Sequence, residues 1–327
     1  MQIQSIETQL QSIPLETPFV TALRRVENVE FVRVKVVCEN GLTAFGEAPA
    51  TMAITGEDLA IIENSLEYIS FYLLQKSVHK ALTLLHSATI GSSAKAALDM
   101  AFVSLLAQEQ SLELYEYLGA KEKRKIQTDI TISLNPKEKM LQDAKKAFAN
   151  GHRILKIKLG KDIAHAIDVT QALSQALPQA KLLIDANQAW SLKDALLYVE
   201  TMQNRPLALI EQPVKAKELA ALKKITQISH IPILADEAAF SLADVKHIIT
   251  SRSADMINIK LMKCGGVTKA VEILEYARVK NVKCMLGSML EGPISIGVAE
   301  HLAMAYSDVI EYVDLDSPLL YKKGFRL

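Results

Sequence analysis

Three acidic residues end short apolar runs in the second half of the 327-residue chain. Asp185 ends LLID, Glu211 ends LALIE and Asp236 ends ILAD. Carboxylates that meet at one point repel one another unless a cation lies between them, and all-oxygen ligation with room for water and substrate suits Mg²⁺. We therefore predict a magnesium site on these three residues, with Glu237 as the alternative to Asp236, because adjacent strand residues point to opposite faces. Taken singly, each carboxylate could instead cap a helix or pair with a lysine.

Two lysines on runs of the same kind could move protons. Lys158 ends LKIK and Lys260 ends INIK. A free lysine has a pKa of about 10.4 and is a poor base at neutral pH. A nearby Mg²⁺ and a second ammonium, which Lys156 supplies, both disfavour the charged form. Two such lysines on opposite faces of a substrate can remove a proton and return it from the other side, and the alternative is an ion-pair network with the carboxylates.

Asp314 and Asp316 end the last of these runs, VIEYVDLD. Positions i and i+2 of a strand share a face, so the two carboxylates form a pocket for a cation. A substrate that reaches both this pocket and the metal would carry a carboxylate at one end and an ammonium at the other, as a dipeptide does. The alternative is a surface turn before Pro318.

The apolar runs themselves recur with an even period. They begin near residues 128, 155, 182, 207, 233, 256, 283 and 309, a spacing of 23–27 residues, with helical stretches between them. Strands that alternate with helices indicate a parallel sheet, and eight such units indicate a closed barrel whose chemistry sits where the strands end. An open, doubly wound sheet is the alternative.

The first 120 or so residues have a different pattern, of mixed α and β type. Apolar and polar residues alternate from Val29 to Cys38, and the pair Asn40-Gly41 separates this run from the run 42–47. An Asn-Gly pair between two strand-like runs predicts a hairpin in which both turn residues have positive φ.

Helical patterning follows from Gly56 to Gln110, and Ser92 or Ser93 is the expected cap of a helix that reaches Leu106. We predict an α+β domain over residues 1–125 and a barrel over residues 126–327, with the last few residues returning to the first domain.

Composition narrows the class of protein. Lys plus Arg and Asp plus Glu both number 37, so the formal charge is zero and no excess charge favours nucleic acid or an anionic membrane as a partner. We expect neither a membrane span nor a secretory leader, because the chain has no long uncharged run and its first residues lack a basic start followed by an apolar stretch. Three widely spaced cysteines, Cys38, Cys264 and Cys284, fit a reducing compartment, so we expect a cytoplasmic protein.

The charged motifs together resemble the enolase superfamily and, within it, the muconate lactonizing enzyme subgroup. The matching residues are Lys156-x-Lys158, Asp185, Glu211, Asp236 and Lys260. The resemblance covers nearly the whole chain and implies an α/β fold: a modified TIM barrel, (β/α)₇β, behind an N-terminal α+β capping domain. It also implies abstraction of the proton α to a carboxylate, with Mg²⁺ binding that carboxylate and stabilising the enediolate, as is known for this superfamily.

Further stretches resemble the dipeptide epimerases of the L-Ala-D/L-Glu type. They are ALRR, GEAPATMAITGE, LKIKLGKD, DANQAW and INIKLMKCGG. The resemblance implies that Asp314 and Asp316 bind the α-ammonium group of the substrate and that Lys156 holds the enediolate oxygen. It implies that Arg24, in a mobile loop, contacts the acidic side chain of the substrate's glutamate; the residues alone favour a solvated loop charge at Arg24 instead.

The function expected from these motifs is that of a Mg²⁺-dependent isomerase, a dipeptide epimerase. It inverts the α-carbon of the C-terminal residue by two-base 1,1-proton transfer, with Lys158 and Lys260 as the bases and a peptidoglycan fragment as a candidate substrate. The scaffold is commonly homo-oligomeric. The chain departs from the family in ending at Leu327, eleven residues after Asp316, where members usually continue for some tens of residues.

The alternatives are enzymes of the same superfamily: o-succinylbenzoate synthase, N-succinylamino acid racemase or muconate cycloisomerase. The stretch 287–292 resembles the last of these, and Ser288 within it is an expected substrate-binding residue. Because these substrates lack an ammonium group, the Asp314/Asp316 pair argues against them. A metal- or peptide-binding module without activity would tolerate the loss of one lysine, and both are present.

Overall fold

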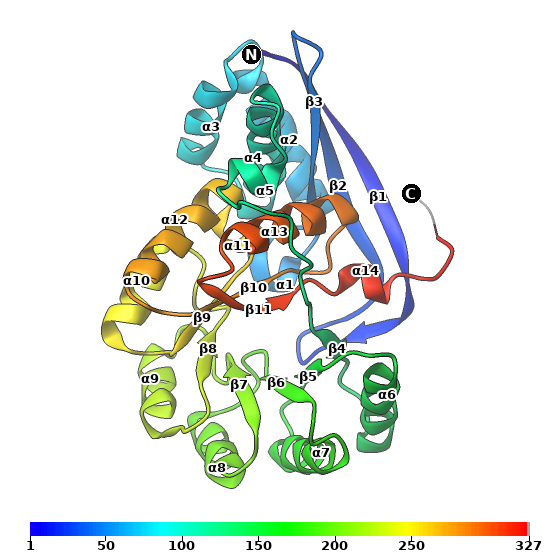
Figure 1. The fold of residues 1–327 in the computed structure, drawn as a ribbon, viewed down its shortest axis with the longest axis vertical. Helices are drawn as coiled ribbons and strands as arrows, with labels where there is room; N and C mark the ends of the chain where they lie inside the picture. The colour runs from blue at the N-terminus through cyan, green and yellow to red at the C-terminus, as the bar shows by residue number, and fades with distance from the viewer. Residues whose placement is uncertain (326–327) are drawn as a thin grey trace.

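Two sheets of opposite kind organise the computed structural model, which describes residues 1–325 (Figure 1). The first is antiparallel, in the order β1 (Ile3–Val20), β2 (Arg25–Cys38) and β3 (Thr43–Pro49). The second has eight strands, β4 to β11, paired in chain order, and all of its ladders are parallel. The predicted fold class, a barrel behind an N-terminal α+β region, is confirmed.

The barrel strands and helices alternate as the period of the sequence predicts. The strands are β4 (Ile130–Ile132), β5 (Ile154–Lys158), β6 (Lys181–Asp185), β7 (Leu207–Glu211), β8 (Ile233–Ala235), β9 (Met256–Ile259), β10 (Cys284–Gly287) and β11 (Ile310–Asp314). The helices are α6 (Lys137–Ala149), α7 (Ile163–Ala176), α8 (Leu192–Met202), α9 (Leu219–Ile228), α10 (Leu242–Ser251), α11 (Leu261–Cys264), α12 (Val267–Val279) and α13 (Pro293–Ala305). Seven βα units followed by β11 give the expected (β/α)₇β order.

The barrel is closed between its first and last strands by a few contacts. The backbone N–H of Asp129 donates to the carbonyl of Val313 at 2.9 Å. Beside it, the backbone N–H of Leu315 donates to the hydroxyl of Thr128 at 2.8 Å. We call residues 128–131 and 313–316 the seam.

An apolar floor fills the barrel beneath its charged mouth. The floor consists of Leu183, Leu209, Leu234, Met256, Met285 and Tyr312, all buried. The three leucines each lie two residues before a predicted metal ligand, so leucine and ligand share the inner face of a strand. Charge is thereby confined to the end of the barrel where the strands finish.

Helices cover one face of the antiparallel sheet. They are α2 (Leu59–Leu73), α3 (Val78–Ser87) and α4 (Ser92–Glu109), and the short α1 (Met52–Thr55) and α5 (Leu114–Tyr117) flank them. Val32, Val34 and Val36 of β2 are fully buried in this core, as the alternation of the sequence predicts. Helix α4 is buried on nearly every side because it also packs on α11 and α12 of the barrel.

The Asn40-Gly41 hairpin is confirmed between β2 and β3, but the expected turn conformation is wrong. Of the two residues only Gly41 has a positive φ, of 84°. The backbone N–H of Cys38 donates to the carbonyl of Leu42, and the N–H of Leu42 donates to the Asn40 side chain at 3.2 Å. The asparagine therefore acts through its side-chain oxygen rather than through its backbone.

The start of α4 also differs from expectation, because no serine caps it. The N-cap residue is Gly91, and the carboxylate of Glu57 accepts hydrogen bonds from the backbone N–H groups of Ser93 (2.8 Å) and Ala94 (3.2 Å). A Cβ on Gly91 would lie 2.0 Å from Glu57 Oε1. A buried carboxylate from another segment thus replaces the local hydroxyl, and the glycine makes room for it.

Buried hydrogen bonds tie the antiparallel sheet to the barrel. Glu47 of β3 accepts from the backbone N–H groups of Ile294 (2.9 Å) and Ser295 (3.0 Å) in the first turn of α13. At the end of β1, the carbonyl of Val20 accepts from the N–H of Leu134 at 3.0 Å, and its own N–H donates to Ser133 Oγ at 3.2 Å.

The chain after the barrel returns to the antiparallel sheet. Helix α14 (Ser317–Leu320) is followed by Tyr321, which pairs with Leu15 of β1, and the N–H of Lys322 donates to the carbonyl of Pro14 at 2.8 Å. Figure 1 shows this red segment beside the blue strand β1. The boundary at residue 125 stays a prediction.

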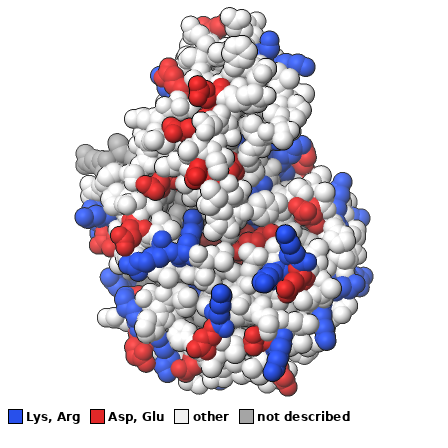
Figure 2. Space-filling view, turned by 180° about the vertical axis from the view of Figure 1, so that it is seen from behind, with Lys and Arg blue, Asp and Glu red and all other residues white. Residues whose placement is uncertain are grey.

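The surface carries both signs of charge. On the face drawn in Figure 2, Lys and Arg lie beside Asp and Glu over much of the lower half, and neither sign forms one large patch. Within residues 1–325, no helix combines the length and the apolar character needed to cross a membrane.

Candidate active site

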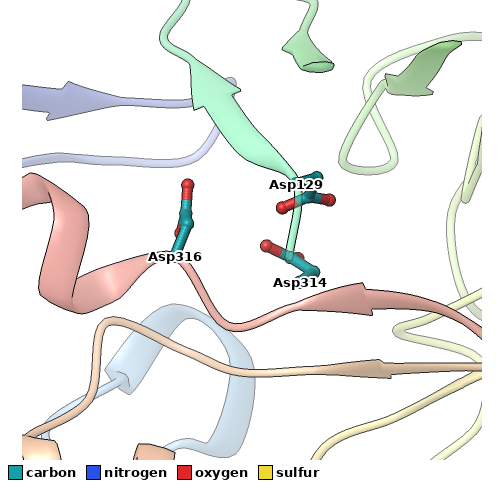
Figure 3. A group of neighbouring side chains, drawn as sticks. All are labelled: Asp129, Asp314 and Asp316. Atoms are coloured by element: carbon teal, nitrogen blue, oxygen red, sulfur yellow. The ribbon is translucent and has the colours of Figure 1, made fainter. Parts of the chain in front are cut away.

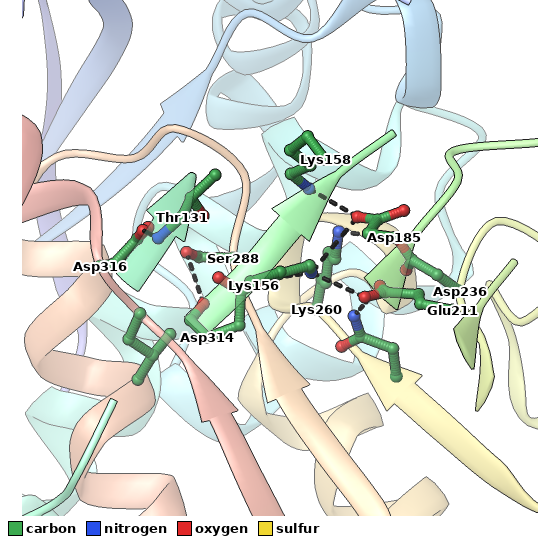
Figure 4. A network of polar contacts seen from close by, with 12 residues as sticks. Thr131, Lys156, Lys158, Asp185, Glu211, Asp236, Lys260, Ser288, Asp314 and Asp316 are labelled. Carbon is green, nitrogen blue, oxygen red and sulfur yellow. Dashed lines mark hydrogen bonds and ion pairs between the residues drawn. The ribbon is translucent and has the colours of Figure 1, made fainter. Parts of the chain in front are cut away.

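The mouth of the barrel brings the predicted metal ligands and lysines together (Figure 4). We call this set the lysine–carboxylate centre; it consists of Lys156, Lys158, Asp185, Glu211, Asp236 and Lys260. Each of these side chains is buried. They meet because parallel strands of one barrel finish at the same end, so residues far apart in the chain share one mouth.

Each carboxylate of the centre contacts an ammonium group. Lys158 Nζ lies 2.5 Å from Asp185 Oδ2, and Lys260 Nζ lies 2.7 Å from Asp236 Oδ2. Lys156 Nζ lies 2.7 Å from Glu211 Oε2 and 3.5 Å from Asp185 Oδ2. The ion pairs expected as the alternative are therefore present, and they do not exclude catalysis, because Lys158, Asp236 and Lys260 also line one cavity.

Two buried side chains that the sequence analysis missed orient these carboxylates. Lys263 Nζ lies 2.5 Å from Asp236 Oδ1 and donates to the carbonyl of Asn258 at 2.9 Å. The amide of Asn258 donates to Glu211 Oε1 at 2.7 Å. Asn258 precedes Lys260 by two residues, so strand alternation would have placed it on the inner face.

The backbone after two strands takes an unusual conformation. Gln212 follows Glu211 with φ of 35°, and Asn187 follows Asp185 by two residues with φ of 43°. The side-chain oxygen of Gln212 accepts from the N–H of Asp236 at 3.0 Å, which ties the end of β7 to the end of β8. Positive φ at residues other than glycine costs free energy, so these loops are held by the contacts around them.

A glycine in β10 makes room for a predicted base. A Cβ on Gly287 would lie 2.7 Å from Asn258 Oδ1 and 3.1 Å from Cε of Lys260. A larger residue at this position would displace both side chains, so the glycine is a spatial requirement of the mouth.

The ion pairs set the protonation of the centre. Burial alone would raise the pKa of Asp236, but the ammonium groups of Lys260 and Lys263 hold it below its usual range. Burial alone would lower the pKa of Lys260, yet the Asp236 carboxylate raises it above its usual value. Burial and the neighbouring Asp185 raise the pKa of Glu211 to about 7. While Asp236 is its direct partner, Lys260 therefore keeps its proton, which differs from the lowered pKa expected of a base.

The donor set of the centre fits a hard divalent cation. Asp185, Glu211 and Asp236 come from three adjacent strands and offer only oxygen ligands. Glu211 Oε2 is buried and accepts no hydrogen bond, although an ammonium lies beside it. Glu237, the alternative to Asp236, is buried, and its Oε2 also has no partner.

A second group of carboxylates lies at the seam (Figure 3). We call it the acidic pocket: Asp129, Asp314 and Asp316, each of which offers an oxygen within 4.8 Å of the other two. Asp314 Oδ2 lies 2.5 Å from Lys156 Nζ, so the pocket adjoins the centre rather than lying apart from it. Asp316 accepts from the backbone N–H of Thr131 at 2.7 Å. Sequence analysis found the strand-end pair but not Asp129.

The three carboxyl groups of the pocket differ in protonation. Burial alone would raise the pKa of Asp314, but Lys156 and Lys158 hold it below its usual range. Burial and the charge of Asp314 raise the pKa of Asp316 to about 6. Burial, followed by the charges of Asp314 and Asp316, raises the pKa of Asp129 well above its usual value.

One narrow cavity joins the two groups. Lys158, Lys260, Asp314 and Asp316 line it together with Ser288, whose hydroxyl donates to the carbonyl of Asp314 at 3.0 Å. The cavity is roofed by residues of the β1–β2 loop and of α1.

Arg24 belongs to this roof. It lies in the loop between β1 and β2, it lines the cavity, and burial lowers its pKa. No carboxylate within residues 1–325 forms an ion pair with it. Phe19 of the same roof places its ring centroid 5.8 Å from Lys158 Nζ. Seven of the ten predicted site residues line this cavity. The other three, Lys156, Asp185 and Glu211, lie behind it in contact with lining residues or with one another, and the roles of all ten stay predictions.

Comparison with known families gives matches over both halves of the chain. Residues 5–119 match the mandelate racemase/muconate lactonizing enzyme N-terminal domain, and residues 139–325 match the enolase C-terminal domain-like family. The chain belongs to this family of the enolase superfamily. The predicted family is therefore confirmed.

Individual relatives are similar along their whole length. An L-amino acid-D/L-Glu epimerase from Sulfurimonas denitrificans is 60% identical over 99% of this chain and 95% of its own. The structure of a substrate-liganded L-Ala-D/L-Glu epimerase from Bacillus subtilis matches with a TM-score of 0.95 and 39% identity, covering 99% of this chain and 92% of the other.

A third match is to a dipeptide epimerase from Enterococcus faecalis, complexed with Mg and the dipeptide L-Leu-L-Tyr. It has a TM-score of 0.94 and 32% identity and covers 99% of this chain and 92% of that one. The prediction of an isomerase that acts on amino acid derivatives is confirmed by these relatives, each of which is named as an epimerase.

Proposed function

We propose that the protein is a Mg²⁺-dependent dipeptide epimerase of the L-Ala-D/L-Glu type that inverts the α-carbon of the C-terminal residue. One observation carries the proposal: a single cavity joins two buried lysines on β5 and β9 to a pair of carboxylates at the end of β11. The two lysines are what proton exchange at a carbon needs, and the pair of carboxylates is what recognition of a substrate ammonium group needs. The epimerase relatives support the same activity.

Lys158 and Lys260 are the two proposed catalytic bases. They come from strands on different sides of the mouth and both line the cavity, so a substrate between them presents one face of its α-carbon to each. The neutral lysine removes the α-proton, and the charged lysine on the other face returns one to the opposite side, which inverts the centre. Lys156, between Glu211 and Asp314, is proposed to hold the substrate carboxylate as negative charge moves onto it.

Asp185, Glu211 and Asp236 are proposed to hold Mg²⁺. When bound there, the ion supplies positive charge to the substrate carboxylate, which makes the neighbouring C–H bond more acidic. Lys260 can act as a base only when Asp236 has another cation as partner, because the Asp236 carboxylate otherwise keeps the lysine protonated. Asp236 is thus both a proposed metal ligand and the ion-pair partner of Lys260.

The other end of the cavity is proposed to bind the N-terminal residue of the dipeptide. Asp314 and Asp316 face the ammonium group, and Ser288 holds the Asp314 backbone in place. Arg24 has no carboxylate partner in the described part of the chain, so an acidic side chain of the substrate's second residue is its proposed partner. A dipeptide from peptidoglycan in the cytoplasm fits this chemistry, and Cys38, Cys264 and Cys284 are all free thiols.

Exchange of the α-proton tests the proposal. The purified protein is incubated with Mg²⁺ and L-Ala-L-Glu in D₂O, and the glutamate α-hydrogen is followed by proton NMR. Loss of this signal, abolished by EDTA and restored by added Mg²⁺, is the expected result. Absence of exchange with L-Ala-L-Glu and with a panel of other dipeptides would reject it, and a lyase such as o-succinylbenzoate synthase would then be assayed on its own substrate.

A further inference from the structure

We propose that Asp129 is a specificity-determining residue that supplies the third carboxylate of the acidic pocket and so makes the seam end of the cavity select substrates with a free ammonium group. The inference deepens the proposed function, on which it rests. It concerns the residue directly before β4, whereas of the proposed ammonium ligands Asp314 ends β11 and Asp316 follows it.

The position of Asp129 leaves its carboxyl group without a partner. The residue is fully buried, and among residues 1–325 neither of its side-chain oxygens has a hydrogen-bond partner. Its backbone N–H is fixed at the seam by the carbonyl of Val313 at 2.9 Å. Figure 3 shows its carboxyl group above Asp314, with Asp316 on the neighbouring turn. Burying a carboxyl group without a hydrogen-bond partner costs free energy. We therefore expect a bound ligand to supply a group that offsets this cost.

The charge at the pocket is not balanced by the protein. Lys156 contacts Asp314 and Glu211, and within residues 1–325 no ion pair shorter than 4.0 Å reaches Asp129 or Asp316. The pocket therefore holds more acidic groups than cations. Burial and its two acidic neighbours raise the pKa of Asp129 well above its usual value, as expected of a carboxyl group that lacks a cation.

The geometry of the acidic pocket favours an ammonium group over a metal ion as the cation that balances its charge. One oxygen of Asp314 already contacts Lys156, and one oxygen of Asp316 already accepts from Thr131. An ammonium group has three N–H donors and needs only one oxygen for each, whereas Mg²⁺ requires near-octahedral ligation.

Asp129 acts from behind the other two carboxylates. Asp314 and Asp316 line the cavity, but Asp129 does not. An ammonium group bound in the pocket favours the charged form of Asp129, and that charge then acts across a buried, low-dielectric region, where charge interactions are stronger than in water. In these terms Asp129 is a positioning residue, distinct from the catalytic lysines.

The test compares two ligands that differ only in the ammonium group. Binding of L-Ala-L-Glu and of N-propanoyl-L-glutamate, in the presence of Mg²⁺, is measured by calorimetry for the unchanged protein and for Asp129→Asn. The expected result is a preference for the free amine that falls about tenfold in the variant, with little change for the propanoyl ligand. Because the variant removes a buried carboxyl group without a partner, its melting temperature is expected to stay equal or rise.

A control variant and a metal titration complete the test. Asp143→Asn, on the outer helix α6, removes the same charge far from the cavity and is expected to keep the full preference. An unchanged preference in Asp129→Asn, or no preference in the unchanged protein, would overturn the inference whether or not α-proton exchange is seen. A Mn²⁺ titration that shows a second ion lost in Asp129→Asn would also overturn it, because the pocket would then be a metal site.

Discussion

The lysine–carboxylate centre and the acidic pocket are two groups of buried acids in one cavity, and they differ in how their charge is compensated. At the centre, Asp185, Glu211 and Asp236 each contact a lysine ammonium. In the pocket, neither Asp129 nor Asp316 forms an ion pair with any residue of the described range 1–325. Lys156 alone joins the two groups, with Glu211 on one side and Asp314 on the other.

The difference separates two tasks. Because the charges of the lysine–carboxylate centre already balance, its residues can change their ion-pair partners. Its lysines can then gain or lose protons while its carboxylates hold another cation. A pocket with excess negative charge attracts its cation from outside. The first arrangement suits chemistry that is common to every substrate, and the second suits recognition of one end of a particular substrate.

The largest effect is expected from removing a base. Lys158→Ala or Lys260→Ala should each lower the rate of epimerisation by a factor of at least about 10²–10⁴, because each lysine serves one face of the α-carbon. The rate is measured by polarimetry or NMR, with circular dichroism as a check on folding. Appreciable epimerisation by either variant would break the two-base scheme.

A smaller effect, a loss of Mg²⁺ affinity, is expected from substituting a proposed metal ligand. Asp236→Asn should weaken Mg²⁺ binding by about 100-fold or more, since it removes a charged oxygen from the ligand set. Affinity is measured by calorimetry or by Mn²⁺ competition. Asp308→Asn, an exposed acid on the far side of the barrel wall, is the matched control and should bind as the unchanged protein does. Unaltered metal affinity in Asp236→Asn would move the site to other residues.

A substitution in the acidic pocket should weaken substrate binding and leave metal binding unchanged. Asp316→Asn is expected to raise KM for L-Ala-L-Glu by about tenfold and to leave Mg²⁺ affinity unchanged, because its carboxylate faces the ammonium end of the cavity. Steady-state kinetics and a metal titration are run on the same preparation. Equal loss of both would mean that the strand-end pair is structural, and the contrast between the two groups would fail.

The smallest expected effect is a dependence on pH. Burial and the charge of Asp314 raise the pKa of Asp316 to about 6, so acid converts it to its neutral form at a higher pH than an ordinary aspartate. Below about pH 6, kcat/KM for a free-amine dipeptide should therefore fall several-fold, while above it the carboxylate is charged and binding is complete. Asp129, Asp314 and Lys158 also face this group, so the profile of Asp316→Asn is the control and should lack the decline.

Much of the site follows from strand alternation. The inner face of β6 carries Leu183 and then Asp185, and β7 repeats the pattern with Leu209 and Glu211. A period of two fixes which residues share a face, and a parallel barrel fixes which ends meet. Ion-pair partners are different, because the contacts of Lys156 with both Glu211 and Asp314 depend on side-chain reach, which the sequence does not encode locally.

Asp129 escaped prediction for a geometric reason. It lies directly before β4, whereas chemistry was sought where strands end. Closing a barrel staggers its first strand against its last, so the start of β4 lies beside the end of β11 and Asp129 reaches Val313. The cap of α4 was also not predicted, for a related reason. Glu57, which accepts from the backbone N–H groups at the start of this helix, is more than thirty residues away in the sequence.

The hydrogen bonds of Val20 affect how substrate and product enter and leave the mouth of the barrel. The loop that carries Arg24 is fastened to the barrel by Leu134 and Ser133, while Glu47 anchors β3 separately. Each of these two hydrogen bonds is worth about 0.5–1.5 kcal/mol. The loop is therefore expected to separate from the barrel more readily than the packed layers on either side unfold.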